Sequence, residues 1–303
     1  MTPRRITVAE RRARLARRHL LLPGTRTDDV AMIAEQLVAL HSSDPVSVYL
    51  SATARMKNPA IDAVEKALYV DRSVVRHHAM RRTLWVAPPE AMRTMHAAAT
   101  RKLVAPERRR TLGLLADSGV GDPESWLDDA QRQVLAALHE HGPLTARALG
   151  IRVPALRRPL VMSPGKRYSA TVSAHTRVLL GLGFSGDLIR TRPTGTWVNG
   201  QYTWAAADSW LPGGLEQPDG LAGRRRDTAD AARELAHRWL RSFGPGTTAD
   251  LQWWAGWTAT TTRRALADAA AVPVLLDEEP GWVAAGDEDP VAGETGQPWV
   301  ALL

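Results

Sequence analysis

The first part of the chain carries apolar residues at intervals of three and four, which is the spacing of one buried helix face. The members of this row are Val30, Ile33, Leu37 and Leu40. At the same spacing the row continues to His41 and Asp44, and Pro45 follows directly. Because proline is incompatible with a helix interior, we expect Pro45 to end the helix. The pattern therefore predicts a helix over 28–44 whose core-facing side finishes in an imidazole and a carboxylate.

The clearest order of elements lies in residues 131–208. The stretch "QRQVLAALHEHGPLTARALG" reads as a helix, a turn at 142–143 and a short second helix with Thr145 as its N-cap. A loop rich in proline and arginine separates it from "SATVSAHTRVLLGLG", a third helical stretch closed by glycine. The following "LIRTRPTGTWVNGQYTWA" alternates around turn residues, as hairpins do. Three helices followed by a hairpin form the layout of a winged helix.

The same order recurs on either side of this segment. Over 229–285 three helical stretches precede the hairpin "VPVLLDEEPGWVA", and Thr247 or Thr248 opens the second helix. In the N-terminal part, helices at 7–19, 28–44 and 59–70 precede the strand pair "SVVRHHAMRRTLWVAP". The order of elements repeats without a residue-level repeat. We therefore predict a mainly α fold with β-hairpin wings (α+β), built from tandem winged helix-turn-helix units.

Shifts in composition suggest where these units begin and end. The expected divisions are 1–100 for the first unit, 101–130 for a linker, 131–210 for the second unit, 211–228 for a linker and 229–303 for the third unit. The second linker is rich in glycine and proline. The sequence stops on the apolar run "QPWVALL" with no turn or cap after it. We accordingly expect the third unit to be truncated.

Charge indicates the kind of partner. The 303 residues carry a formal net charge of +7, and basic residues cluster in 4–18, 72–110 and 152–192, whereas 277–289 is acidic. A basic surface of this kind favours a polyanion, nucleic acid first. The sequence contains no run of about 18 apolar residues that could span a membrane. The N-terminal apolar stretch is too short for a signal peptide. We expect a cytoplasmic, nucleoid-associated protein.

Two stretches of the sequence resemble a known family. They are "LVALHSSDPVSVYLSATAR" and "RRTLWVAP", and they are similar to the bacterial winged-helix DNA glycosylases related to AlkZ and YcaQ. In that family a helix ends in a Gln-x-Gln pair followed by Asp-Pro, and a later hairpin carries an R-x-T-L stretch. Here His41 and Ser43 stand in place of the two glutamines. The resemblance covers about residues 5–303.

The resemblance implies hydrolysis of the N-glycosidic bond of N7- or N3-alkylated purines, including bulky adducts or interstrand crosslinks, with no cofactor. A purine alkylated at N7 is cationic and leaves readily, so the enzyme has to stabilise an oxocarbenium-like sugar and position water. Asp44 suits the first task, and His41, with an ordinary pKa of about 6.5, suits a general base. Ser43 can hold the water or a phosphate oxygen.

A structural interpretation of the same residues remains open. Serine and aspartate before a proline commonly cap a helix, and a histidine beside a core is commonly a hydrogen-bonded structural group. The histidine spacings do not fit a metal site, and there is no glycine-rich phosphate loop or nucleophile elbow. Nine of the eleven tryptophans lie after residue 190, where we expect them to pack in cores.

Arginines of the hairpins are the expected contacts to double-stranded DNA. The candidates are Arg76, Arg81 and Arg82 in the first hairpin, with Arg157, Arg158, Lys166 and Arg167 as a second patch. Such residues usually meet phosphates or the minor groove, although a solvated surface is the alternative for any one of them.

The rival function is a non-catalytic winged-helix DNA-binding protein, either a regulator or a lesion binder. A regulator usually dimerises to match paired half-sites. The sequence shows no heptad or long dimerisation helix, and we expect a monomer.

Overall fold

The N-terminal and C-terminal parts of the chain fold together. The computed structural model describes residues 3–162, 167, 169–195, 201–216 and 226–291. It divides into unit 1, formed by Met1–Ala99 with Pro218–Leu303, and unit 2, formed by Thr100–Gln217. The segments 1–100 and 229–303, which the sequence suggested as two separate units, thus lie in one. Each unit is described by itself below.

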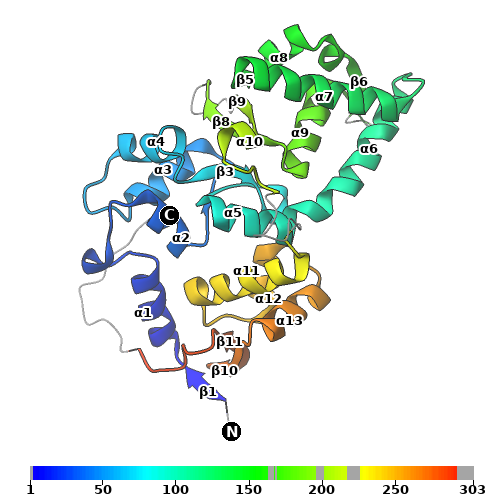
Figure 1. Cartoon of the computed structure of the whole chain (residues 1–303). Coiled ribbons are helices and arrows are strands. Elements are labelled where there is room, and N and C mark those ends of the chain that lie inside the picture. The colour runs from blue at the N-terminus through cyan, green and yellow to red at the C-terminus, as the bar shows by residue number, and fades with distance from the viewer. Residues whose placement is uncertain (1–2, 163–166, 168, 196–200, 217–225, 292–303) are drawn as a thin grey trace. The chain divides into compact units, whose positions relative to one another are not determined.

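The N-terminal half of unit 1 is a small helical layer against a three-stranded sheet (Figure 1). Its helices are α2 (Val30–Gln36), α3 (Pro45–Thr53), α4 (Ile61–Tyr69) and α5 (Pro89–Met95), whereas α1 (Val8–Arg18) packs against the C-terminal half of the unit. Its antiparallel sheet has the order β2 (Leu40–His41), β4 (Leu84–Ala87), β3 (Val75–His78). The strand pair β3–β4 is the hairpin that alternation predicted.

The helix expected over 28–44 is shorter than its apolar row. α2 ends at Gln36, Val38 adopts a left-handed backbone with φ of 63°, and the chain continues as strand β2. Pro45 then opens α3 instead of closing α2, because the first helical position needs no N–H from its residue. Leu37 and Leu40 remain in the core of this half, so the same burial is reached by a helix, a turn and a strand.

The C-terminal half of unit 1 has three helices and a hairpin in the predicted order. These are α11 (Thr228–Phe243), α12 (Thr248–Ala255), α13 (Ala259–Asp268), β10 (Val272–Leu276) and β11 (Glu279–Val283). Thr247 caps α12 in a capping box with Asp250. The first strand of the chain, β1 (Arg4–Ile6), pairs in parallel with β10 and completes this sheet, as Figure 1 shows.

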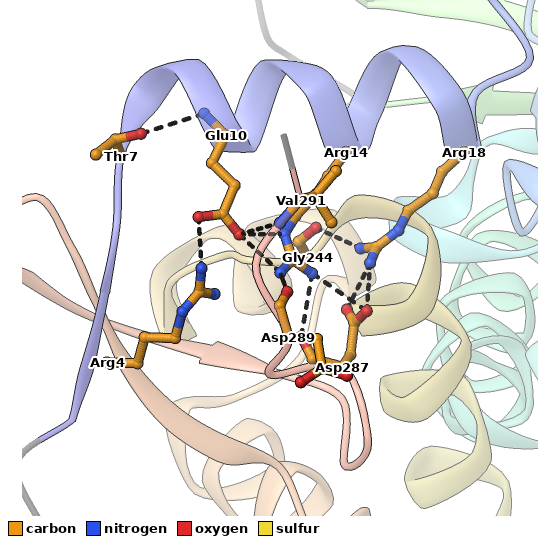
Figure 2. Close-up of polar contacts among 9 residues, drawn as sticks. All are labelled: Arg4, Thr7, Glu10, Arg14, Arg18, Gly244, Asp287, Asp289 and Val291. Carbon is orange, nitrogen blue, oxygen red and sulfur yellow. Dashed lines mark hydrogen bonds and ion pairs between the residues drawn. The ribbon is translucent and has the colours of Figure 1, made fainter. Parts of the chain in front are cut away.

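A buried ion-pair network holds α1 to the segment after β11 (Figure 2). Arg14, which is 1% exposed, contacts Glu10 one turn earlier and Asp287 across the interface at 3.2 Å. Arg18 donates to both carboxylate oxygens of Asp287 at 2.6 Å. The backbone N–H of Val291 donates to Glu10 at 3.3 Å. The two ends of the described chain are therefore tied together by charge as well as by strand pairing.

Unit 2 also contains the three helices and hairpin predicted for the middle segment. They are α7 (Pro123–His141), α8 (Ala146–Arg152), α9 (His175–Ser185), β8 (Leu188–Pro193) and β9 (Tyr202–Ala206), with β5 (Leu144–Thr145) completing the sheet in the order β5-β9-β8. Thr145 caps α8 through the N–H of Ala148, as expected. The turn of the β8–β9 hairpin, residues 196–200, lies outside the described residues.

Two parts of unit 2 differ from expectation. The segment expected as a linker over 101–130 contains α6 (Val104–Asp117) and the start of α7, and both Leu115 and Leu127 lie in the core. The stretch expected to begin the third helix instead starts as β7 (Ala170–Ser173), which pairs with β6 (Pro159–Met162). The partner strand lies in the Pro- and Arg-rich loop, so helical spacing alone could not reveal this pairing.

The segment expected as a second linker, 211–228, is only partly described. It follows α10 (Ala207–Trp210), and Leu211 and Leu215 within it are buried. Residues 217–225 lie outside the described part of the chain. None of the helices in the described ranges is long and apolar enough to cross a membrane.

Candidate functional site

His41 is held at the edge of the β2-β4-β3 sheet by strand pairing. It lies opposite Trp85 in the β2–β4 register, and the two rings meet edge to face with centroids 5.0 Å apart. The Trp85 indole N–H donates to the Thr83 hydroxyl at 2.9 Å and approaches the Met80 carbonyl at 3.2 Å. A fixed indole therefore sets the position of an exposed imidazole.

The exposed His41 ring is hydrogen bonded to the next outward-facing residue. Its Nε2 lies 3.1 Å from the Ser43 hydroxyl oxygen. Partial burial, and then the positive charge of Arg81, lower the pKa of His41 below its ordinary value. The imidazole is consequently neutral at pH 7 and able to accept a proton.

Asp44 begins α3. Its carboxylate accepts the backbone N–H of Val46 at 2.9 Å, which makes it the N-cap, and the residue is exposed. His41 ends β2, and Ser43 and Asp44 follow on the short connection to α3, so His41 and Asp44 do not lie on the helix face that their spacing suggested. Asp44 is thus a helix cap, as the structural interpretation expected, and its carboxylate remains at the surface.

Ser42 points the opposite way and anchors the connection. It is fully buried, its N–H donates to the Leu84 carbonyl, and its hydroxyl accepts from Arg76 Nε at 2.8 Å. Arg76 also donates to the Tyr69 hydroxyl at 2.9 Å and is only 1% exposed. Arg76, expected at the DNA surface, is thereby placed inside the fold, where it holds the loop that carries His41 and Ser43.

Arg81 and Arg82 form the turn of the β3–β4 hairpin. Both have left-handed backbones, with φ of 55° and 65°, and both are exposed. The Arg81 guanidinium lies over the ring of Trp253, 4.0 Å from its centroid. Both predicted cations are therefore exposed at the tip of a hairpin whose strand β4 also pairs with the strand that carries His41.

The second predicted basic patch lies in unit 2 and is only partly assembled. Arg157 is exposed at a cavity of about 970 Å³, Arg158 donates to the Ser118 carbonyl, and Arg167 is exposed. Lys166 lies outside the described residues. The cavity is also lined by Arg147, His175, Arg190, Tyr202 and Trp204, which the sequence analysis did not single out. Arg190 lies over the rings of Trp204 and Tyr202, with centroid distances of 4.8 and 5.5 Å.

Two histidines of the β3–β4 hairpin are internal. His77 and His78 of β3 are both buried, and His77 Nε2 lies 3.2 Å from His96 Nδ1. Within the described ranges no three His, Cys, Asp or Glu side chains are grouped to hold a metal ion. The residue that sequence reasoning missed in unit 1 is Trp253, because nothing local distinguishes it from its buried neighbour Trp254.

Comparisons with known proteins agree with this architecture. The family model for AlkZ-like DNA glycosylases matches residues 34–303. A comparison with curated protein sequences finds no match. Among solved structures, the Streptomyces sahachiroi DNA glycosylase AlkZ is similar in fold, with a TM-score of 0.64 and 19% sequence identity over 93% of this chain and 71% of that chain. Since the family model matches most of the sequence, this protein belongs to the AlkZ-like DNA glycosylase family.

Proposed function

We propose that this protein hydrolyses the N-glycosidic bond of purines alkylated at N7 or N3 in double-stranded DNA, with His41, Ser43 and Asp44 at the reaction centre. The observation that carries the proposal is the hydrogen-bonded pair of exposed side chains, His41 and Ser43, next to the exposed carboxylate of Asp44. The proposal is supported by the family resemblance, in which His41 and Ser43 stand in place of the two glutamines and Asp44 belongs to the Asp-Pro that follows them.

The alkylated purine leaves without being protonated by the enzyme. In an N7-alkylated purine nucleotide the C1′–N9 bond breaks with its electron pair moving to the purine, which cancels the cationic charge of the ring. The sugar becomes oxocarbenium-like, and a water oxygen bonds to C1′. One proton of that water must then be removed. The products are an abasic sugar, a neutral alkylated purine and the released proton.

Each of the three residues has a role in that sequence. His41 is neutral because its pKa is lowered, and its imidazole takes the water proton. Asp44, held by its hydrogen bond from Val46, places negative charge where the sugar becomes positive. The Ser43 hydroxyl, which contacts His41, orients the water or a phosphate oxygen.

Exposed arginines in each unit support double-stranded DNA as the substrate. Arg81 and Arg82 lie exposed in the hairpin turn, and Arg157 lies exposed in unit 2; such side chains bind phosphates without reading sequence. Since His41, Ser43 and Asp44 are exposed, the site also suits bulky adducts or crosslinks that would not enter a closed pocket. A single lesion has no paired half-sites, so we propose that the protein acts as a monomer, on nucleoid DNA.

Base release from a duplex with one N7-methylguanine tests the proposal. Wild-type protein is compared with His41→Ala and Asp44→Asn, and a second duplex carries a bulkier N7 adduct. Exposed His141, in unit 2, gives the control variant His141→Ala. We expect excision by wild type and by the control, with losses of about 10²–10⁴-fold in the two site variants.

A non-catalytic DNA-binding protein is the second candidate. It is favoured by one observation, namely that Asp44 already serves as a helix cap, a role that needs no chemistry. Salt-dependent binding to DNA without release of either lesion would establish this candidate and overturn the glycosylase proposal.

A further inference from the structure

Helix α12 carries two adjacent tryptophans with opposite surroundings. Trp254 is 8% exposed and meets Trp85 and Phe243, with ring centroids 5.8 and 6.0 Å away. Trp253 is 66% exposed. An indole left this open contributes little to a core, whereas the large flat face it offers suits another planar ring.

The exposed indole is part of a shaped surface beside His41. Arg81 covers one face of Trp253 at 4.0 Å, and the Trp85 ring links the helix that carries Trp253 to His41 through its contacts with Trp254 and His41. Gly256, at the end of α12, adopts φ of 63°, and a Cβ there would lie 3.0 Å from Arg81 Cγ. Because glycine has no Cβ, the turn after α12 leaves room for the Arg81 side chain to lie over the Trp253 indole.

The rings inside the fold fix the position of α12 relative to the candidate site. Trp85 touches both His41 and Trp254, which joins β2 to α12 through one side chain. These contacts also fix the position of Trp253, because Trp254, the next residue on the helix, is held in the core. A stacking surface is thus set at a defined place next to the proposed reaction centre.

We propose that Trp253 is the stacking site for the extruded alkylated purine. This inference rests on the proposed function and names how the same site recognises its base. An alkylated purine that carries a positive charge gains both stacking and cation–π attraction on an indole. Arg81, on the other indole face, meets the phosphate next to the extruded nucleotide, which offsets the repulsion between two cations.

Binding to duplexes that cannot react separates this role from catalysis. One duplex carries N7-methylguanine on a 2′-fluorinated sugar, which resists glycosidic cleavage; the second carries a tetrahydrofuran abasic analogue, and the third is undamaged. The variants are Trp253→Ala, Trp253→Phe and the control Val70→Ala, which truncates another exposed apolar residue of unit 1. Thermal melting of each variant checks the fold.

We expect Trp253→Ala to lower affinity for the lesion duplex by about 5- to 150-fold while affinity for the abasic duplex stays within about twofold. Trp253→Phe should recover most of the loss, and Val70→Ala should lose nothing. Equal losses on the lesion and abasic duplexes would overturn base stacking in favour of a wedge inserted into the helix. Unchanged lesion affinity in Trp253→Ala would also overturn it.

The same binding measurements test the assignment of Trp253 separately from the proposed function. Wild-type protein that binds lesion and undamaged duplexes equally would contradict lesion recognition as a whole. Wild-type preference for the lesion, retained in Trp253→Ala, would contradict only the assignment of Trp253.

Discussion

His41 and Trp85 face each other across the β2–β4 pairing, with ring centroids 5.0 Å apart and ring planes at 78°. The contact continues from Trp85 to Trp254 on α12, and from there to Phe243 at the end of α11. The position of an exposed imidazole near the N-terminus thus depends on aromatic packing with residues about 200 positions later. The candidate site at 41–44 therefore depends on the folding of unit 1 as a whole.

The first prediction concerns the pH dependence of excision. In the proposed mechanism the neutral form of His41 is the base, and its pKa is lowered, so the rate should rise with pH through a value below 6.5 and then level off. Arg81→Gln removes one cause of the lowering and should move this acidic limb to higher pH, short of 6.5 because burial remains. Single-turnover excision between pH 4.5 and 8, corrected for spontaneous depurination, measures the limb. An unmoved limb would contradict the electrostatic coupling of Arg81 to His41.

The second prediction separates the cap and the charge of Asp44. Asn and Asp cap helices about equally, whereas Ala costs about 1 kcal/mol at this position. Asp44→Asn should keep the free energy of unfolding within about 0.5 kcal/mol and still lose excision, whereas Asp44→Ala should lose both. Urea unfolding and base release are measured on the same samples. Full activity in Asp44→Asn would leave the carboxylate with a structural role only.

The third prediction separates buried from exposed arginines. Arg82→Gln and Arg157→Gln should each reduce the slope of log affinity against log salt by about 0.9, the amount expected for one lost phosphate contact. Arg76 is buried against Ser42 and Tyr69, so Arg76→Gln should keep the slope and lower stability by about 1–3 kcal/mol. A changed salt slope in Arg76→Gln would show that it reaches DNA after all.

The fourth prediction concerns the network of Figure 2. Asp287→Asn leaves Arg14 and Arg18 without a full counter-charge in a largely buried place, and should lower the free energy of unfolding by about 3–5 kcal/mol. The matched control is Asp268→Asn, which breaks an exposed pair with Arg264 and should change stability by less than about 0.5 kcal/mol. Chemical denaturation measures both, and equal effects would refute the importance of burial here.

The fifth prediction is an acid dependence of stability due to His19. Burial, then the charge of Arg55, lower the pKa of His19 from 6.5 to about 4. Between these values the unfolded chain binds more protons than the folded one, so stability falls as pH drops from 6.5 to about 4. The loss amounts to about 3 kcal/mol. His19→Asn should flatten this part of the stability–pH curve, and exposed His141→Asn should not; urea unfolding at pH 7 and 4.5 compares them.

Part of the candidate site could be predicted because it depends on neighbours in sequence. Alternation along 75–87 predicts the hairpin, and two turn positions place Arg81 and Arg82 at its tip. His41 and Asp44, which the spacing put on the core-facing side of a helix, are exposed instead. What failed was the element assigned to them, since Val38 turns the chain out of α2.

The sequence by itself determined the order of helices and hairpin over 229–285, the hairpins at 75–87 and 188–206, the cap at Thr145 and the choice of Thr247 or Thr248 for α12, because helix period, strand alternation and capping act over a few residues. Only the tertiary structure decided that 40–41 pairs with 85–86 and that Arg76 points inward. It alone decided which of two adjacent tryptophans remains exposed. The physical reason is that apolar spacing indicates which residues are buried but not which segment buries them. That segment, and the backbone hydrogen bonds it forms, come from distant parts of the chain.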